Sequence, residues 1–357
     1  MTTSQSRERR RRAERRRLLR NRALGVLALL GALAIAAILL HGRGGRSGAH
    51  SAGLSNVDGR IGAGTPAAPP RSQTGLPLGA PPLTLSGAAR AGADPVQLAF
   101  HDPPRAGILV NLDTGQVLWQ RNPYLRVPIA SLTKMMTALL SVESTSADSP
   151  VLVTKAAINA DGSKVGVLPV GRKVRAQSML YGLLLPSGND AAVALAEHVS
   201  HTVNAFVLRM NAEAARLGLG CTRYSSPSGY FDAGNYSCAA DLAELAHIDL
   251  LQPRIASVVR TYAAILPFPI KGGKLYLYNN NPLLIYGYPG LTGMKTGYTE
   301  AAGRCLVATA RRHGVDLGAV VLNSHDPGTQ ARDLLNRGFT DVYHLPPVPE
   351  QPLPPGV

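Results

Sequence analysis

Residues 126–137 read RVPIASLTKMMT, and they place a serine three residues ahead of a lysine. The stretch at 134–143, KMMTALLSVE, has the apolar and largely unbranched composition of a helix. Residues i and i+3 of a helix share one face, so the amine of Lys134 can approach the hydroxyl of Ser131. A lysine in an apolar helix is costly to bury, and the sequence therefore predicts a chemical use for Lys134.

The pair alone is a weak signal. A free serine is a poor nucleophile, and a lysine can serve as its base when burial or a second cation lowers the lysine pKa. The same spacing also arises by chance, where a serine caps a helix and the lysine is solvated. Two further motifs, at 187–189 and 295–297, help to decide between a catalytic pair and a chance spacing.

The second motif of the chain is Ser187, Gly188 and Asn189, which lie between two helical patterns. A hydroxyl and a carboxamide displayed on one loop can relay a proton and bind a substrate amide. The same residues ahead of DAAVALAEHV are also good helix-starting chemistry, and both roles can hold together. We therefore expect Ser187 and Asn189 on a loop that opens a helix.

The third motif is Lys295, Thr296 and Gly297, which enter an alternating apolar run typical of a strand. Lysine and threonine side chains that face a cleft can hold a substrate carboxylate. The glycine would leave room for an extended substrate along the strand edge. A hairpin with a surface lysine is the alternative interpretation.

The three motifs, spaced 56 and 108 residues apart in the order 131→187→295, resemble those of the serine D-alanyl-D-alanine carboxypeptidases. These enzymes are the low-molecular-mass penicillin-binding proteins. The resemblance extends to the surrounding stretches PIASLTKMMTALL, GLLLPSGNDAA and GMKTGYTEAAGRCLVATA. It implies an α+β fold of the penicillin-binding transpeptidase and β-lactamase-like type, with an antiparallel sheet flanked by a helical subdomain.

The resemblance also implies a role for each catalytic residue. Ser131 would be the acylated nucleophile, Lys134 its general base, and Ser187 the relay that carries a proton to the leaving amine. The substrate would be the D-Ala-D-Ala end of peptidoglycan stem peptides, and β-lactam antibiotics would inhibit by mimicking it. No cofactor is implied, and no H-E-x-x-H or C-x-x-C motif supports a metal site.

The substrate-binding residues follow from the same resemblance. Asn189 would hold the substrate amide, while Lys295 and Thr296 would meet the terminal carboxylate beside Gly297. The backbone N–H groups of the nucleophile and of Tyr298 would form the oxyanion hole. Family members commonly bind carboxylate with an arginine ahead of the last helix, where only Arg332 lies close, so that role stays open.

The chain order suggests one catalytic domain with tails. Strand patterns occur at both ends of the domain and helical patterns lie between them, which predicts an α+β fold with one antiparallel sheet. The predicted segments are a basic tail, a membrane anchor, a disordered Gly/Pro/Ala-rich linker, the catalytic domain and a Pro-rich tail, at 1–22, 23–40, 41–95, 96–345 and 346–357.

The net charge of +15 would ordinarily suggest a nucleic-acid partner. Residues 1–22 hold ten arginines and two glutamates, and residues 23–40 carry no charge, so much of the excess lies beside an apolar run. That pattern predicts a single-pass membrane helix with an extracytoplasmic catalytic domain, and no nucleic-acid partner. A cleaved signal peptide, which would give a secreted protein, is the alternative.

The chain has three cysteines, so at least one of them cannot form a disulfide within the exported domain. Cys221 and Cys238 bracket a loop-rich stretch and are candidates for a disulfide bridge. Cys305 lies in an apolar strand pattern and is most simply a core residue.

Three other functions compete with the carboxypeptidase. A class A β-lactamase needs a glutamate to activate a deacylating water, and only Glu197, Glu213 and Glu244 lie between the second and third motifs, each in a helical pattern. A D,D-endopeptidase acting on peptidoglycan cross-links would use the same site. A catalytically silent cell-wall binding module would not need the complete set of motifs that this chain has.

Overall fold

The computed structural model describes residues 83–85, 94–230 and 233–348, all within one unit that spans Ala67–Val357. The predicted basic tail and membrane anchor, residues 1–40, lie outside the described residues, as does most of the predicted linker and of the Pro-rich tail. Within the described part of the chain, none of the helices combines the length and apolar character needed to cross a membrane.

A five-stranded antiparallel sheet forms the centre of the domain, in the order β2-β1-β11-β10-β9. Its strands are β1 Ala106–Asn111, β2 Val117–Arg121, β9 Leu291–Thr299, β10 Gly303–Arg312 and β11 Val315–Ser324. Strand β1 pairs with β11, with Ile108 opposite Val320, so the two ends of the domain meet in one sheet. The predicted α+β architecture with a sheet made from both chain ends is confirmed.

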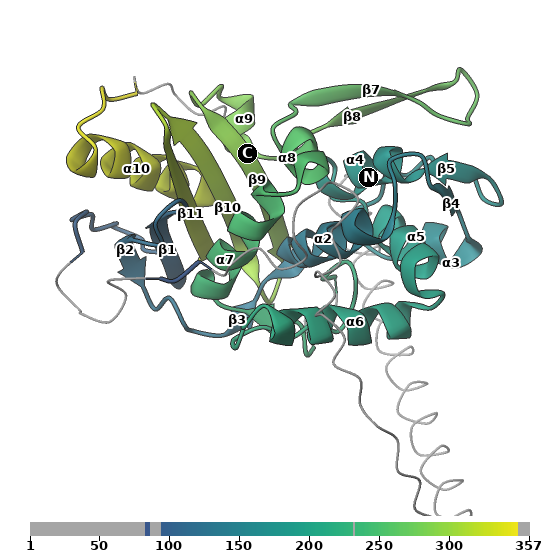
Figure 1. Cartoon of the computed structure of the whole chain (residues 1–357), viewed down its shortest axis with the longest axis horizontal. Coiled ribbons are helices and arrows are strands. Elements are labelled where there is room, and N and C mark those ends of the chain that lie inside the picture. The colour runs from purple at the N-terminus through teal and green to yellow at the C-terminus, as the bar shows by residue number, and fades with distance from the viewer. Residues whose placement is uncertain (1–82, 86–93, 231–232, 349–357) are drawn as a thin grey trace, which may run out of the picture. The chain divides into compact units, whose positions relative to one another are not determined.

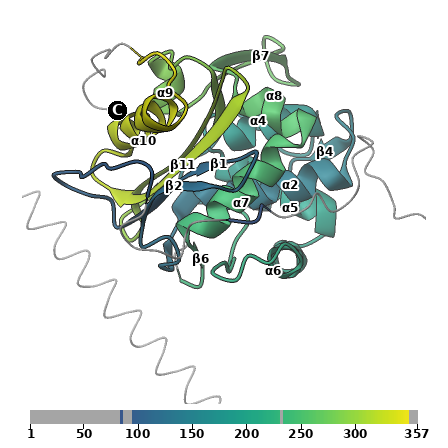
Figure 2. The same ribbon diagram turned by 60° about the vertical axis from the view of Figure 1, so that its left-hand side comes forward.

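Both faces of this sheet are covered, which explains why its central strands read as nearly continuous apolar runs. Helix α10, Pro327–Arg337, packs on one face through Leu334 and Leu335. Helices α2, Lys134–Ser144, and α7, Ala239–Leu250, pack on the other face, and Figures 1 and 2 show them across the sheet from α10. The helical subdomain continues outward from α2.

The subdomain contains five further helices and two short sheets. The helices are α3 Lys155–Ile158, α4 Ala176–Leu184, α5 Asn189–Ser200, α6 Val203–Arg216 and α8 Pro253–Val259. The paired short strands are β3 Val127–Pro128 with β6 Tyr236–Ser237, and β4 Pro150–Leu152 with β5 Lys173–Arg175. The remaining short helices are η1 Ala130–Thr133, α9 Pro282–Ile285 and η2 Gly338–Val342.

Two apolar sequence patterns each form two elements in the structure. The helical pattern at 189–218 becomes α5 and α6, because His201 takes a φ of 64° and the Thr202 side chain accepts a hydrogen bond from Ala205 N to start a new helix. The run that begins at Lys295 forms the β9–β10 hairpin, as in the alternative interpretation of this stretch, but Lys295 is buried and does not lie on the surface. A second hairpin, β7 Ala263–Pro267 with β8 Lys274–Tyr278, was not predicted, and Figure 1 shows it extending from the domain.

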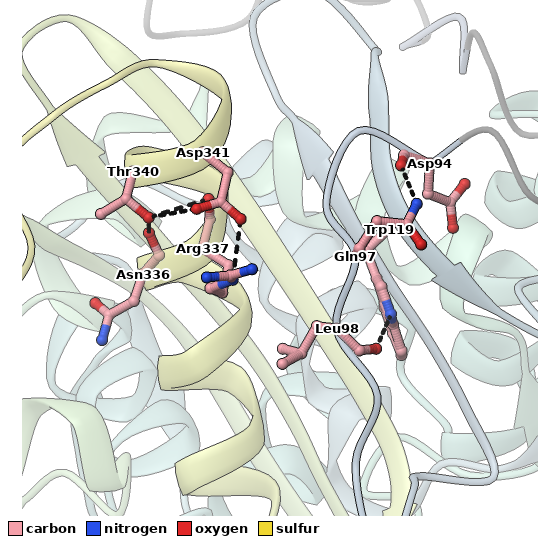
Figure 3. A network of polar contacts seen from close by, with 8 residues as sticks. All are labelled: Asp94, Gln97, Leu98, Trp119, Asn336, Arg337, Thr340 and Asp341. Atoms are coloured by element: carbon pink, nitrogen blue, oxygen red, sulfur yellow. Dashed lines mark hydrogen bonds and ion pairs between the residues drawn. The ribbon is translucent and has the colours of Figure 1, made fainter.

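Part of the predicted linker contacts the domain. The backbone N–H of Leu83 donates to Glu244 Oε2 at 2.6 Å, and Asp94 Oδ2 accepts a hydrogen bond from Gln120 N at 3.0 Å. Figure 3 shows the next contacts along this segment, where Trp119 Nε1 donates to the carbonyl of Leu98 at 3.0 Å. Ordered contacts with the domain therefore begin before residue 96.

The cysteines are arranged as the sequence suggested. Cys221 and Cys238 form a disulfide, with a Cα–Cα distance of 5.6 Å, which joins the turn just after α6 to the N-cap of α7. Cys305 is buried in β10.

Candidate active site

A cavity of about 310 Å³ opens where the N-terminal end of α2, the loop before α5 and strand β9 come together. It brings residues from all three predicted motifs to one place. The lining residues are Ser131, Ser163, Ser187, Asn280, Pro282, Thr296, Gly297, Tyr298, Arg304, Cys305, Pro327 and Gly328.

Ser131 lies in η1, and Lys134 is the first residue of α2, so the two are one helical turn apart. The Lys134 amine donates to Ser131 Oγ at 2.8 Å and to the carbonyl oxygen of Ser228 at 2.7 Å. Lys134 is 0% exposed. A buried amine in hydrogen-bond contact with a hydroxyl at the cavity wall is arranged for proton transfer.

The electrostatic environment favours the neutral form of this amine. Burial lowers the pKa of Lys134 well below its usual value, and the nearby Lys295 lowers it further, while Asp190 acts in the opposite direction. Burial also lowers the pKa of Lys295, to about 7. The neutral amine, whose lone pair can accept a proton, is therefore more accessible for Lys134 than for a solvated lysine.

The backbone around the nucleophile is held in an unusual conformation. Ala130 has a φ of 48°, in the left-handed region that non-glycine residues rarely enter. Its carbonyl accepts a hydrogen bond from Thr133 Oγ1 at 2.8 Å, and a Cβ on Gly229 would lie only 1.9 Å from that carbonyl oxygen. The loop that carries Gly229 and Ser228 is thus packed directly against the turn that presents Ser131.

Ser187 faces the same cavity from the loop before α5. Its φ is 65°, and its buried Oγ has no hydrogen-bond partner among the described residues. A buried hydroxyl without a protein partner is available to a substrate atom. Asn189 is differently placed, because its Nδ2 donates to the carbonyl of Asp161 at 2.5 Å and it does not line the cavity.

Strand β9 supplies the opposite wall, where Thr296, Gly297 and Tyr298 line the cavity. Lys295 is buried beneath them, and its Nζ donates to the carbonyl of Thr296 at 2.9 Å. A Cβ on Gly297 would lie 3.1 Å from Ser131 N. The space left by this glycine is therefore used by the nucleophile segment, and its use by an extended substrate remains a prediction.

Sequence reasoning missed several residues of the cavity. Ser163 and Asn280 come from loops with no recognised motif, and Arg304 lies on β10 opposite Tyr298. Arg332 does not line the cavity, since its guanidinium pairs with Asp333 at 2.9 Å. Arg304 follows the turn after Tyr298 by only a few residues. That proximity could have identified Arg304 as a cavity residue, but only with the β9–β10 hairpin already known.

The described residues contain one group of side chains close enough to hold a metal ion, namely Cys221, Cys238 and Asp241. The disulfide takes up both sulfurs, so this group does not offer thiolate ligands. None of these three residues lines the cavity.

Comparison with known proteins agrees with this geometry. A family model described as D-alanyl-D-alanine carboxypeptidase matches residues 102–326. A D-alanyl-D-alanine carboxypeptidase of Bacillus subtilis is 36% identical over 250 residues, which cover 68% of this chain and 64% of that protein. Another from Mycobacterium tuberculosis is 38% identical over 226 residues, covering 63% of this chain and 75% of that protein.

The fold agrees as well. The crystal structure of the Streptomyces K15 DD-transpeptidase matches with a TM-score of 0.64 and 32% identity, over 68% of this chain and 100% of that one. The predicted penicillin-binding fold is thereby confirmed. This chain belongs to the D-alanyl-D-alanine carboxypeptidase family, a family of serine peptidases.

Proposed function

We propose that this protein removes the terminal D-Ala from D-Ala-D-Ala stem peptides of peptidoglycan through a serine acyl-enzyme. The observation that carries the proposal is the 2.8 Å hydrogen bond between the buried Lys134 amine and Ser131 Oγ. The family, and the meeting of all three motifs at one cavity, support the choice of substrate.

In the first step, Ser131 Oγ attacks the carbonyl carbon of the penultimate D-Ala, and its proton passes to Lys134 Nζ. The developing oxyanion would be held by the backbone N–H groups of Ser131 and Tyr298. The close approach of β9 to Ser131 N at Gly297 supports this pairing.

In the second step the C–N bond breaks, and the departing D-Ala amine takes a proton relayed from Lys134 through Ser187. The unpartnered Oγ of Ser187 supports its part in this relay. Water then attacks the ester, Lys134 again takes a proton, and Ser131 is released with the shortened peptide. A β-lactam would acylate Ser131 by the same first step.

The competing β-lactamase would need a carboxylate at the acyl-enzyme. Glu197 accepts a hydrogen bond from Thr154 Oγ1 at 2.6 Å, Glu213 pairs with Arg216, and Glu244 accepts from Leu83 N. None of the three lines the cavity. These positions favour a long-lived penicilloyl-enzyme over rapid β-lactam hydrolysis.

The test is mass analysis of a peptide ending in D-Ala-D-Ala after incubation with the protein, alongside Ser131→Ala as a control. We expect loss of a single alanine with the wild type and none with the variant. Relatives named D-alanyl-D-alanine endopeptidase also match this chain. Cleavage of a cross-linked dimer without loss of the terminal alanine would therefore replace the carboxypeptidase proposal with the endopeptidase.

We also propose that residues 23–40 anchor the protein in the cell membrane, with the catalytic domain outside the cytoplasm. The uncharged run beside ten arginines supports this orientation, and the Cys221–Cys238 disulfide suits an oxidising compartment. A reporter fused after residue 60 should be exposed outside the cytoplasm, and full-length protein should be found in the membrane fraction. A shortened, soluble product would support a cleaved signal peptide instead.

A further inference from the structure

The cavity holds one permanently charged side chain in the described part of the chain. Arg304 is the only arginine, lysine, aspartate or glutamate among the lining residues. It is solvent-exposed and lies on β10, paired across the hairpin with Tyr298 of β9. Directly opposed residues of an antiparallel pair have side chains on the same face, so Arg304 stands next to the end of the third motif.

The guanidinium of Arg304 is weakly engaged. Its one hydrogen bond among the described residues runs from Nη1 to the carbonyl of His325 at 3.4 Å, at the long end of the normal range. No carboxylate of the described residues forms an ion pair with it. By contrast, Arg332 is bound to Asp333 through Nε at 3.0 Å and Nη2 at 2.9 Å, and it lies away from the cavity.

Lys295 is poorly suited to hold a carboxylate by itself. Its amine is buried and donates to the carbonyl of Thr296, and it is not among the residues that line the cavity. Burial lowers its pKa to about 7, so its charged form is less favoured at neutral pH than that of a solvated lysine. An arginine keeps its charge under all of these conditions and presents a planar fork that matches a carboxylate.

We propose that Arg304, together with Thr296, binds the terminal carboxylate of the substrate's leaving D-Ala and the carboxylate of a β-lactam. This assignment rests on the proposed function and names the residue that selects a free C-terminus at that site. Lys295 then serves mainly as the neighbouring cation that keeps Lys134 neutral.

The test compares two peptides that differ only at the C-terminus, diacetyl-lysyl-D-Ala-D-Ala and the same peptide ending in the carboxamide. Release of D-Ala or D-alaninamide gives kcat/KM for each, with the wild type, Arg304→Ala, Arg304→Lys and Arg332→Ala. Arg311→Ala is the matched control, since Arg311 lies on the same strand and pairs with Asp316 away from the cavity.

We expect Arg304→Ala to lower kcat/KM for the free acid by about 10- to 100-fold, the range for one charge-assisted hydrogen bond, and to leave the carboxamide within about threefold. Arg304→Lys should recover part of the loss, because it restores charge without the fork. Arg311→Ala and Arg332→Ala should keep the wild-type preference for the free acid.

Equal losses on both peptides, or no loss on either, would overturn the assignment while leaving the proposed function intact. A selective loss in Arg332→Ala would overturn it in favour of that residue. If the wild type releases neither D-Ala from the free acid nor D-alaninamide from the carboxamide, the proposed function fails and the assignment of Arg304 fails with it.

Discussion

The floor and the rim of the cavity are built in opposite ways. The floor (Ser131, Lys134 and Lys295) is largely buried, and both of its amines are hydrogen-bonded at 2.7–2.9 Å. The rim (Tyr298 and Arg304) is exposed, with Tyr298 at 65%. The one hydrogen bond of Arg304 to the described residues is 3.4 Å long.

The difference follows from what each part has to do. A proton transfer needs donor and acceptor at fixed distance and matched pKa, and burial with tight packing supplies both. A site that admits and releases a peptide needs groups that stay solvated and that gain partners only when the substrate arrives. Substitutions in the floor should therefore affect chemistry and stability, and substitutions in the rim should affect substrate preference.

The largest effect is expected from Lys134→Arg. The variant keeps a positive charge but has no accessible neutral form, so it cannot take the proton of Ser131. We expect acylation by a fluorescent penicillin to slow by about 10²- to 10⁴-fold, with reversible binding retained. Lys274→Arg, at an exposed position of β8, is the control and should acylate normally. Acylation of Lys134→Arg at nearly the normal rate would show that the base is another group.

The next effect is expected from Gly297→Ala, which tests how closely the two walls must approach. The added Cβ would lie 2.9 Å from the carbonyl oxygen of Ile129 and 3.1 Å from Ser131 N. Strand β9 would have to move, and we expect acylation to slow by about 10- to 100-fold with a stability loss of about 1–3 kcal/mol. Gly220→Ala, which has open space around its Cα, should change neither the rate nor the denaturation midpoint.

The third prediction concerns Lys295→Met, which should slow acylation less than Gly297→Ala and should raise stability where Gly297→Ala lowers it. Folding lowers the pKa of Lys295 to about 7 from its usual 10.5, so the unfolded chain binds more protons between these values. At this site, wild-type stability therefore rises with pH across that window. Removing the amine should stabilise the protein at pH 7, by at most about 4 kcal/mol, while impairing acylation.

Urea denaturation at several pH values measures this effect. The advantage of Lys295→Met over the wild type should shrink as the pH rises from about 7 towards 10.5. Lys274→Met is the surface control and should stay within about 0.5 kcal/mol of the wild type. If the stability difference between Lys295→Met and the wild type stays constant or grows with pH, the buried charge of Lys295 is not what destabilises the wild type.

The smallest effect is expected from Tyr298→Ala at the rim. The proposed oxyanion hole uses the backbone N–H of this residue, and its side chain is 65% exposed. Stability should stay within about 0.5 kcal/mol, and penicillin acylation within about threefold of the wild type. A loss comparable to that of Gly297→Ala would show that the floor and the rim are not separable in this way.

The catalytic residues were predictable from the sequence because they lie in short motifs with characteristic spacing. Ser131 and Lys134 are one helical turn apart, and Ser187 and Lys295 stand in motifs whose order identified the family. The family, the fold and the sheet built from both chain ends are confirmed. The assigned roles of the individual site residues remain predictions that the substitutions above will test.

The rim and the connections were not predictable, because they depend on tertiary pairing. Arg304 is placed at the cavity by the pairing of β9 with β10, and the sequence pattern did not give the register of that pairing. The break between α5 and α6 depends on the backbone of His201, inside a pattern that reads as continuous helix. The Asn189 amide is directed to the Asp161 carbonyl, a contact set by a distant loop.

The central claim is that Lys134 is the base and is neutral at physiological pH. It is tested most directly by the acylation rate of the wild type at saturating penicillin, measured by stopped flow as a function of pH. We predict that the rate rises about tenfold per pH unit and levels off at a pKa well below 10.5, as the burial of Lys134 beside Lys295 requires. A rate that keeps rising to pH 10.5, or that does not depend on pH, would contradict this account.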